Sequence, residues 1–514
     1  MIPNVGDVYC VYVEKLQQYT ACQAIGLKET EGKTSDTLAS VLQLDWTGDQ
    51  LPNEMQLHQM KPLICNFYFW NERLVHSFVS ANVPSQYVLA GNIPPLYTEE
   101  TNTYGGGWPI GESLYLQREW EGIDAIRRAQ FKQAADDDKE VMVGDRVMRR
   151  STSTLRDFSP TSAEDVAELA KLPCLTHIEM DGYTESIFPF IEDNPFINEL
   201  HIIHHGQTIL DISSSHLTKL IVDVSGLKEL ILNTKMKSLN FTGELSPDLR
   251  IVAYEDGKCI TLNVPSGLPQ VTGISRLEGL YIRDITELNL EPLVQYYPEL
   301  SELRLWGKPG NVSHLESIQH LANLQTFTTY DLFGFKGEQF PDPEQLPKLA
   351  TLWLTSLPAD AAKSIKTRYK KSAAAGLDIE ITKARKPEWL AENLNNPFRD
   401  WDGRDHIKAA HAKKAAQLYK QCSKEIRHLS QDLDFNNQEA LHKQLVSMVE
   451  NYTQTFNKMD AKTGFIETVE REEIYVVLTA LLEQLQQNLE LRQDDSVKVN
   501  HEELYEVFDR LRDF

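Results

Sequence analysis

Four stretches late in the chain share one pattern and decide its fold. They read Leu-Glu-Gly-Leu-Tyr-Ile at 277–282, Leu-Ser-Glu-Leu-Arg-Leu at 300–305, Leu-Gln-Thr-Phe-Thr-Thr at 324–329 and Leu-Ala-Thr-Leu-Trp-Leu at 349–354. The third is the weakest copy, since a threonine stands at its last apolar position. Leu280, Leu303, Phe327 and Leu352 are separated by 23, 24 and 25 positions. Equivalent residues at so regular a spacing predict stacked repeats, each contributing one short strand.

Further copies extend the repeats toward the N-terminus. They are Leu175/Ile178/Met180, Ile197/Leu200/Ile202, Leu217/Leu220/Val222, Leu227/Leu230/Leu232 and Met236/Leu239/Phe241. Between Leu220 and Leu262 the apolar clusters come about every ten residues, so extended segments are expected on both sides of those turns. The pattern resembles the leucine-rich-repeat family, of the bacterial type, whose unit contains LxxLxL. The resemblance covers under half of the chain and implies a solenoid over residues 160–386.

The same pattern predicts which side chains of the repeats are exposed. Side chains alternate along a strand, so residues between and just after the apolar positions face outward onto the concave sheet. In the regular units these residues are Tyr281, Arg283, Arg304, Trp306, Tyr330 and Trp353. Isolated surface aromatics are ordinary, but Tyr, Trp and Arg recurring in register are typical of binding hot spots. We therefore expect a protein-binding face, with Tyr281, Arg304, Tyr330 and Trp353 stacked on successive strands.

Two different domains are expected on either side of the repeats. Residues 1–118 contain short strands punctuated by Gly and Pro, which predicts a small β-barrel or sandwich, and residues 119–159 predict a helix and a linker. After residue 387 apolar residues recur at helical spacing, as in Ile474, Val477, Leu478 and Leu481, so residues 387–514 predict a helical bundle. The fold class expected is multidomain α+β.

The first strands carry a second resemblance. Gly6-Asp7-Val8-Tyr9 is followed by an apolar strand and by a return strand that begins Tyr19-Thr20-Ala21-Cys22. This short motif is similar to a family of small bacterial immunity proteins from toxin–antitoxin competition systems. The resemblance implies that the chain binds a toxin domain and blocks it.

Charge and cysteine usage limit the kinds of partner. The 514 residues include 51 Lys and Arg against 75 Asp and Glu, a net charge of -24. A field of this sign repels nucleic acids and anionic membranes and attracts basic proteins, although it also simply keeps a large protein soluble. The six cysteines form no CxxC pair, and no apolar run is long enough to span a membrane. We expect a cytoplasmic protein; its oligomeric state is left open.

Three features of the sequence bear on catalysis and on cofactor or metal binding. The segment 460–470 is similar to a calcium loop, but Met459 and Ala461 would occupy ligand positions that need side-chain oxygen. His201, His204 and His205 do not share a strand face. Some bacterial leucine-rich-repeat proteins are ubiquitin ligases with a Cys-x-Asp motif, whereas Cys422 is followed by Ser and Lys. We expect no catalytic residue, no cofactor and no metal.

The sequence therefore predicts a non-catalytic protein-binding protein. The first hypothesis is an immunity or inhibitor protein that neutralises a basic toxin domain. A leucine-rich-repeat scaffold or host-interacting effector is the alternative. An enzyme in a terminal domain, either a hydrolase or a ubiquitin-ligase-like protein, is the third.

Overall fold

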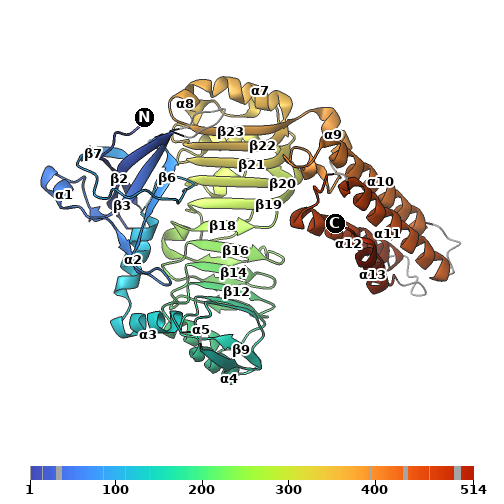
Figure 1. The fold of residues 1–514 in the computed structure, drawn as a ribbon, viewed down its shortest axis with the longest axis horizontal. Coiled ribbons are helices and arrows are strands. Elements are labelled where there is room, and N and C mark those ends of the chain that lie inside the picture. The colour runs from blue at the N-terminus through green and yellow to red at the C-terminus, as the bar shows by residue number, and fades with distance from the viewer. Residues whose placement is uncertain are drawn as a thin grey trace. The chain divides into compact units, whose positions relative to one another are not determined.

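The computed structural model describes residues 2–13, 16–29, 37–84, 86–109, 111–137, 139–393, 395–431, 438–461, 463–490 and 499–514. The chain divides into two compact units, Met1–Ala384 and Arg385–Phe514. The first unit holds the sheets and the second is helical (Figure 1). Within the described residues, none of the helices is both long and apolar enough to cross a membrane.

The first unit begins with a five-stranded sheet. In spatial order its strands are β6 (His76–Ser80), β3 (Thr37–Gly48), β2 (Gln18–Glu29), β1 (Asp7–Val13) and β7 (Val88–Asn92). These strands pair antiparallel, and the hairpin expected near Tyr9 and Cys22 is confirmed, because these two residues are paired. These strands form one sheet with β6 and β7 at its edges, so the predicted small β-barrel or sandwich is not confirmed.

The segment that follows β3 along the chain contains a short hairpin and two helices. The hairpin is short and consists of β4 (Ile64–Cys65) and β5 (Arg73–Leu74), because Phe67 packs into a buried hydrophobic cluster and does not continue the strand. The one helix predicted within residues 119–159 is wrong, since there are two helices, α2 (Glu112–Gly122), which begins earlier, and α3 (Ala125–Ala135). They are separate because Asp124 caps α3, accepting hydrogen bonds from the backbone N–H groups of Ile126 and Arg127. Helix α1 (Glu54–Gln59) is also short.

The repeats form one large parallel sheet of eleven strands. In order they are β10 (Thr154–Phe158), β11 (His177–Asp181), β12 (Glu199–Ile203), β14 (Lys219–Asp223), β16 (Ser238–Thr242), β18 (Thr261–Val264), β19 (Gly279–Asn289), β20 (Glu302–Ser313), β21 (Thr326–Phe333), β22 (Thr351–Pro358) and β23 (Asp378–Arg385). The labelled strands lie one above another in Figure 1. The sheet begins at β10, in the segment predicted to be a linker, after the hairpin of β8 (Glu140–Val143) and β9 (Arg146–Arg149).

A second, smaller sheet explains the ten-residue clusters of the middle repeats. Strands β13 (Ile209–Asp211), β15 (Glu229–Ile231) and β17 (Arg250–Val252) pair in parallel, with Leu210 opposite Leu230 and Leu230 opposite Ile251. Each of these turns therefore has an extended segment on both sides, as the sequence predicted. Leu220, Leu230 and Leu239 are at most 1% exposed and belong to one continuous core between the sheets.

Short helices complete the remaining turns of the repeats. They are α4 (Ala163–Glu168), α5 (Ile187–Asp193), α6 (Leu293–Tyr296), α7 (Ala359–Arg368), α8 (Lys370–Ala374) and the 3-10 turns η1 (Leu169–Lys171), η2 (Tyr254–Gly257), η3 (Leu315–His320), η4 (Gly337–Gln339) and η5 (Pro343–Gln345). Several strands turn at a residue with left-handed backbone, for example Asp284, Asp331 and Ser356. Each of them lies inside its strand, two residues after the last core position of its unit, so β19, β21 and β22 bend at the same place.

The second unit is a helical bundle, as predicted. It contains α9 (Pro387–Asn393), η6 (Arg399–Trp401), α10 (Ala409–Gln431), α11 (Gln438–Asp460), α12 (Thr468–Glu490) and α13 (His501–Leu511). Trp401, Tyr452, Phe456 and Phe508 are at most 1% exposed in its core. The apolar face predicted on α12 is buried there, Leu478, Leu482 and Leu485 included.

Candidate functional site

Strand register in the late repeats brings the predicted binding residues into two neighbouring rows. Tyr281 lies opposite Arg304, Arg304 opposite Thr328, and Thr328 opposite Trp353. In the second row Trp306 lies opposite Tyr330. The predicted stack is therefore wrong at one position: Thr328 stands between Arg304 and Trp353, because Phe327 aligns with Leu303 and fixes Tyr330 two residues farther along its strand.

The side chains of these rows point away from the repeat core. Leu280, Ile282, Leu303 and Leu305 are fully buried, and alternation places their neighbours on the opposite face of the sheet. Trp306 is 40% exposed and Trp353 is 41% exposed. Arg283 is exposed and follows Ile282 as Trp306 follows Leu305. We call Tyr281, Arg304, Trp306, Tyr330 and Trp353, together with the flanking Arg283, the aromatic face.

Packing between Arg304 and Tyr281 organises one end of the aromatic face. The guanidinium carbon of Arg304 lies 4.8 Å from the centre of the Tyr281 ring, a cation–π contact. Arg304 also donates from Nε to Glu302 Oε1 at 2.6 Å. Burial raises the pKa of Tyr281, and the charge of Glu302 raises it further, so the phenol keeps its proton. The three side chains therefore hold one another in place before any partner binds.

The other end of the aromatic face rests on Trp353. Its indole Nε1 donates to Asp378 Oδ2 at 3.2 Å, across the boundary between β22 and β23. One edge of the ring is thereby fixed while two fifths of the residue stays exposed. Asp378 and Glu302 were not identified from the sequence. Both stand one residue before the first apolar position of their strands. That shared position in the sequence could have identified them as neighbours of the aromatic face.

The early repeats present a different surface. Glu199 accepts from Lys219 Nζ at 2.7 Å and lies 2.9 Å from His177 Nε2, so three neighbouring strands are joined by charged groups. Arg250 pairs with Glu229 at 3.0 Å in the second sheet. Charged side chains that already pair with one another contribute little to binding unless a partner replaces those ion pairs. The exposed aromatic residues are therefore the feature that sets the late repeats apart.

The residues considered for catalysis or metal binding have ordinary structural surroundings. His204 lies 2.9 Å from Asp181, and His205 Nε2 contacts the backbone oxygen of Asp223 at 2.6 Å. Cys422 is buried, and burial raises the pKa of its thiol to about 12, which disfavours the reactive thiolate. Among the described residues no group of three His, Cys, Asp or Glu side chains is placed to hold a metal ion. Lys462 of the calcium-like segment lies outside the described residues.

Comparisons with known proteins show a distant structural likeness and no family. No family model matches the chain, and no curated protein sequence matches it. Among solved structures the chain is similar to internalin C2 from Listeria monocytogenes, with 18% identity over 44% of this chain and 89% of that chain. The TM-score of 0.22 is too low for this likeness to support a conclusion about function.

Proposed function

We propose that this protein is a leucine-rich-repeat solenoid that binds another protein through the aromatic face and has no catalytic activity of its own. The observation that carries the proposal is the pair Trp306 and Trp353, each about two fifths exposed on strands whose alternate side chains are fully buried. Large aromatic side chains half-exposed on a rigid sheet lose little conformational entropy on binding, and such residues dominate interface energetics.

The charge of the chain favours a basic partner. A net charge of -24 creates a field that accelerates the approach of a positively charged protein and weakens as salt is added. Together with the N-terminal resemblance to immunity proteins, this makes a basic toxin domain the partner we propose, bound and neutralised in the cytoplasm. A scaffold or host-interacting effector would use the same face, and the identity of the partner distinguishes the two functions.

The test compares the aromatic face with an exposed aromatic residue elsewhere on the repeats. The double variant Trp306→Ala with Trp353→Ala removes both indoles, whereas Tyr254→Ala removes a ring that is 56% exposed in η2. Partners captured from the native cell by the wild-type chain are identified by mass spectrometry, and their affinity is then measured with purified proteins. We expect the double variant to lose at least tenfold in affinity, about 1.4 kcal/mol, and Tyr254→Ala to bind normally.

Two controls keep the result interpretable. The melting temperature of the double variant should stay close to that of the wild type, because neither indole belongs to the buried core. Association should slow as salt rises from 50 to 300 mM, roughly in line with loss of electrostatic steering. Unchanged affinity in a folded double variant would move the binding site away from the aromatic face.

A further inference from the structure

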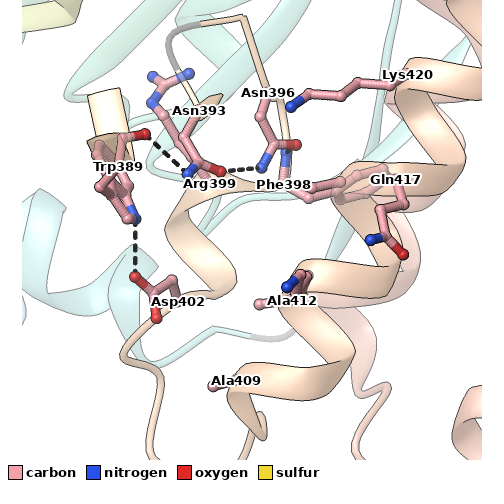
Figure 2. Close-up of a pocket in the computed structure, with 12 residues that line it drawn as sticks. Trp389, Asn393, Asn396, Phe398, Arg399, Asp402, Ala409, Ala412, Gln417 and Lys420 are labelled. Carbon is pink, nitrogen blue, oxygen red and sulfur yellow. Dashed lines mark hydrogen bonds between the residues drawn. The ribbon is translucent and has the colours of Figure 1, made fainter. Parts of the chain in front are cut away.

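A cavity of about 310 Å³ lies within the helical unit, with Trp389, Asn393 and residues 396–402 on one side and α10 on the other (Figure 2). The inner part of its wall on α10 is made of small side chains, since Ala412 and Ala416 stand where larger residues would fill the space. Ala412 is 6% exposed and Ala416 is 9% exposed, so their methyl groups form an inner wall. This volume is at the lower end of the range for small-molecule sites.

The opposite wall is held in place by a chain of hydrogen bonds. Trp389 Nε1 donates to Asp402 Oδ2 at 3.0 Å, Asn393 Nδ2 donates to the Trp389 carbonyl at 3.0 Å, and Asn396 Nδ2 donates to Asn393 Oδ1 at 2.9 Å, as the dashed lines of Figure 2 show. Asn396 is only 2% exposed, and its Oδ1 accepts from the backbone N–H of Phe398 at 3.0 Å. The amide groups of this wall are thus oriented without help from a ligand.

The charges around the cavity are the reverse of those of the whole chain. Lys413 and Lys420 line it from α10, and Arg399 lines it from the other wall. Asp402 is the acidic residue among the lining side chains, and it is already bonded to Arg385 Nη1 at 2.8 Å. Helix α10 carries five Lys or Arg residues and one Glu in a protein with a net charge of -24. A cluster of cations here needs a reason beyond the average composition.

We propose that this cavity binds a small phosphate-bearing ligand. Lys413 and Lys420 place two positive charges at the cavity beside Arg399, which also has another interaction, and this excess of positive charge matches a dianion better than the single charge of a carboxylate. The side-chain amides of Asn393 and Gln417 stand in the same lining and supply N–H donors for phosphate oxygens. Figure 2 shows Lys420 extending from α10 on the side where Asn396 lies, so one cation stands beside the preoriented amides.

The experiment uses the full-length chain and four probes: AMP, inorganic phosphate, adenosine and a single-stranded RNA. Isothermal titration calorimetry should detect AMP and inorganic phosphate, whereas adenosine, which lacks the phosphate, should not bind measurably. Lys420→Glu places a negative charge in the lining and should weaken AMP binding at least tenfold, in line with loss of a charge-assisted contact. Lys414→Glu makes the same change on an exposed residue of α10 outside the lining and should leave AMP binding within about twofold of wild type, as expected for a screened surface charge.

A second variant tests the space itself. Ala416→Leu should fill the cavity beside the inner wall and abolish binding of AMP and inorganic phosphate. Because a buried substitution can disturb folding, the helicity of this variant is checked by circular dichroism. If the helicity falls, the result for Lys420→Glu decides the question. Binding of adenosine as tight as AMP would overturn the proposal, as would absence of binding by AMP and inorganic phosphate. Equal losses in Lys420→Glu and Lys414→Glu, for AMP or for a single-stranded RNA probe, would show a general basic surface and overturn it too.

Discussion

Leu303 is the residue on which the register of the repeat sheet depends most directly. It is fully buried and lies between Leu280 and Phe327 on the neighbouring strands. Leu303→Ala removes three carbons from this row and should lower the free energy of unfolding by about 3 kcal/mol, within the usual range for a buried leucine. Leu303→Asp adds an unpaired buried charge and should cost about 5 kcal/mol or more. That loss is comparable with the whole stability of many domains.

The assay should report where the damage occurs as well as its size. Urea denaturation gives the change in free energy of unfolding, and hydrogen exchange followed by mass spectrometry gives the protection of peptides from β19, β20 and β21. We expect protection to fall first in those strands, because each repeat contacts its neighbours. Ser313→Asp places the same new charge at an exposed position of β20 and is the control. If Leu303→Asp unfolds at the same urea concentration as Ser313→Asp, the assigned register is wrong.

Three further outcomes follow from the described contacts. Glu470 is buried and bonded to Arg404; burial alone would raise its pKa, but the hydrogen bonds it accepts outweigh burial and lower the pKa from 4.5. The ionised carboxylate of Glu470 therefore stabilises the fold above pH 4.5, and this stabilisation is lost as the pH falls through the lowered pKa of the folded state. Glu470→Gln should lower the free energy of unfolding by about 2 kcal/mol at pH 7. In urea titrations the loss should become progressively smaller below pH 4.5. Asn233 is buried and donates to Ser215 Oγ and to the Leu217 carbonyl, each at 2.9 Å, so Asn233→Ala should cost about 2 kcal/mol by the same measurement; a loss below about 0.5 kcal/mol would mean that the freed acceptors find water. Adding EDTA should leave the melting temperature unchanged, and a calorimetric shift would reveal a metal site.

The repeat pattern predicted the strands well because apolar spacing and burial have the same physical origin. Leu280, Leu303 and Leu352 had to share a core once their spacing was known, and the paired strands place them there. For the second sheet, the sequence offered one indication, the closer spacing of the apolar clusters around Leu230. Asn233 was missed because its role depends on Ser215 and Leu217, which lie 18 and 16 residues earlier and become its neighbours only after the chain turns.

The aromatic face shows where spacing alone stops being sufficient. Counting residues placed Tyr330 in the row of Arg304, although the unit around Phe327 carries threonines at both Thr328 and Thr329. The backbone pairs Thr328 with Arg304 and moves Tyr330 into the row of Trp306. The composition of the face was predictable, but its arrangement required the register. The cavity beside α10 was not predicted, because its walls come from segments whose hydrogen bonds leave no periodic trace in the sequence.

The aromatic face and the cavity beside α10 are proposed to bind ligands of opposite charge, and one variant distinguishes the two sites. Binding of a basic protein by the aromatic face is favoured by the acidity of the whole chain, so replacing one more cation by glutamate should not slow that association. Binding of phosphate beside α10 depends instead on local cations, and the same replacement at Lys420 should weaken it. Lys420→Glu should therefore reduce affinity for AMP while leaving affinity for a basic protein partner unchanged or slightly higher. A variant that lost both together would indicate that the helical unit contributes to the protein interface, which would require revising the assignment of binding to the repeats alone.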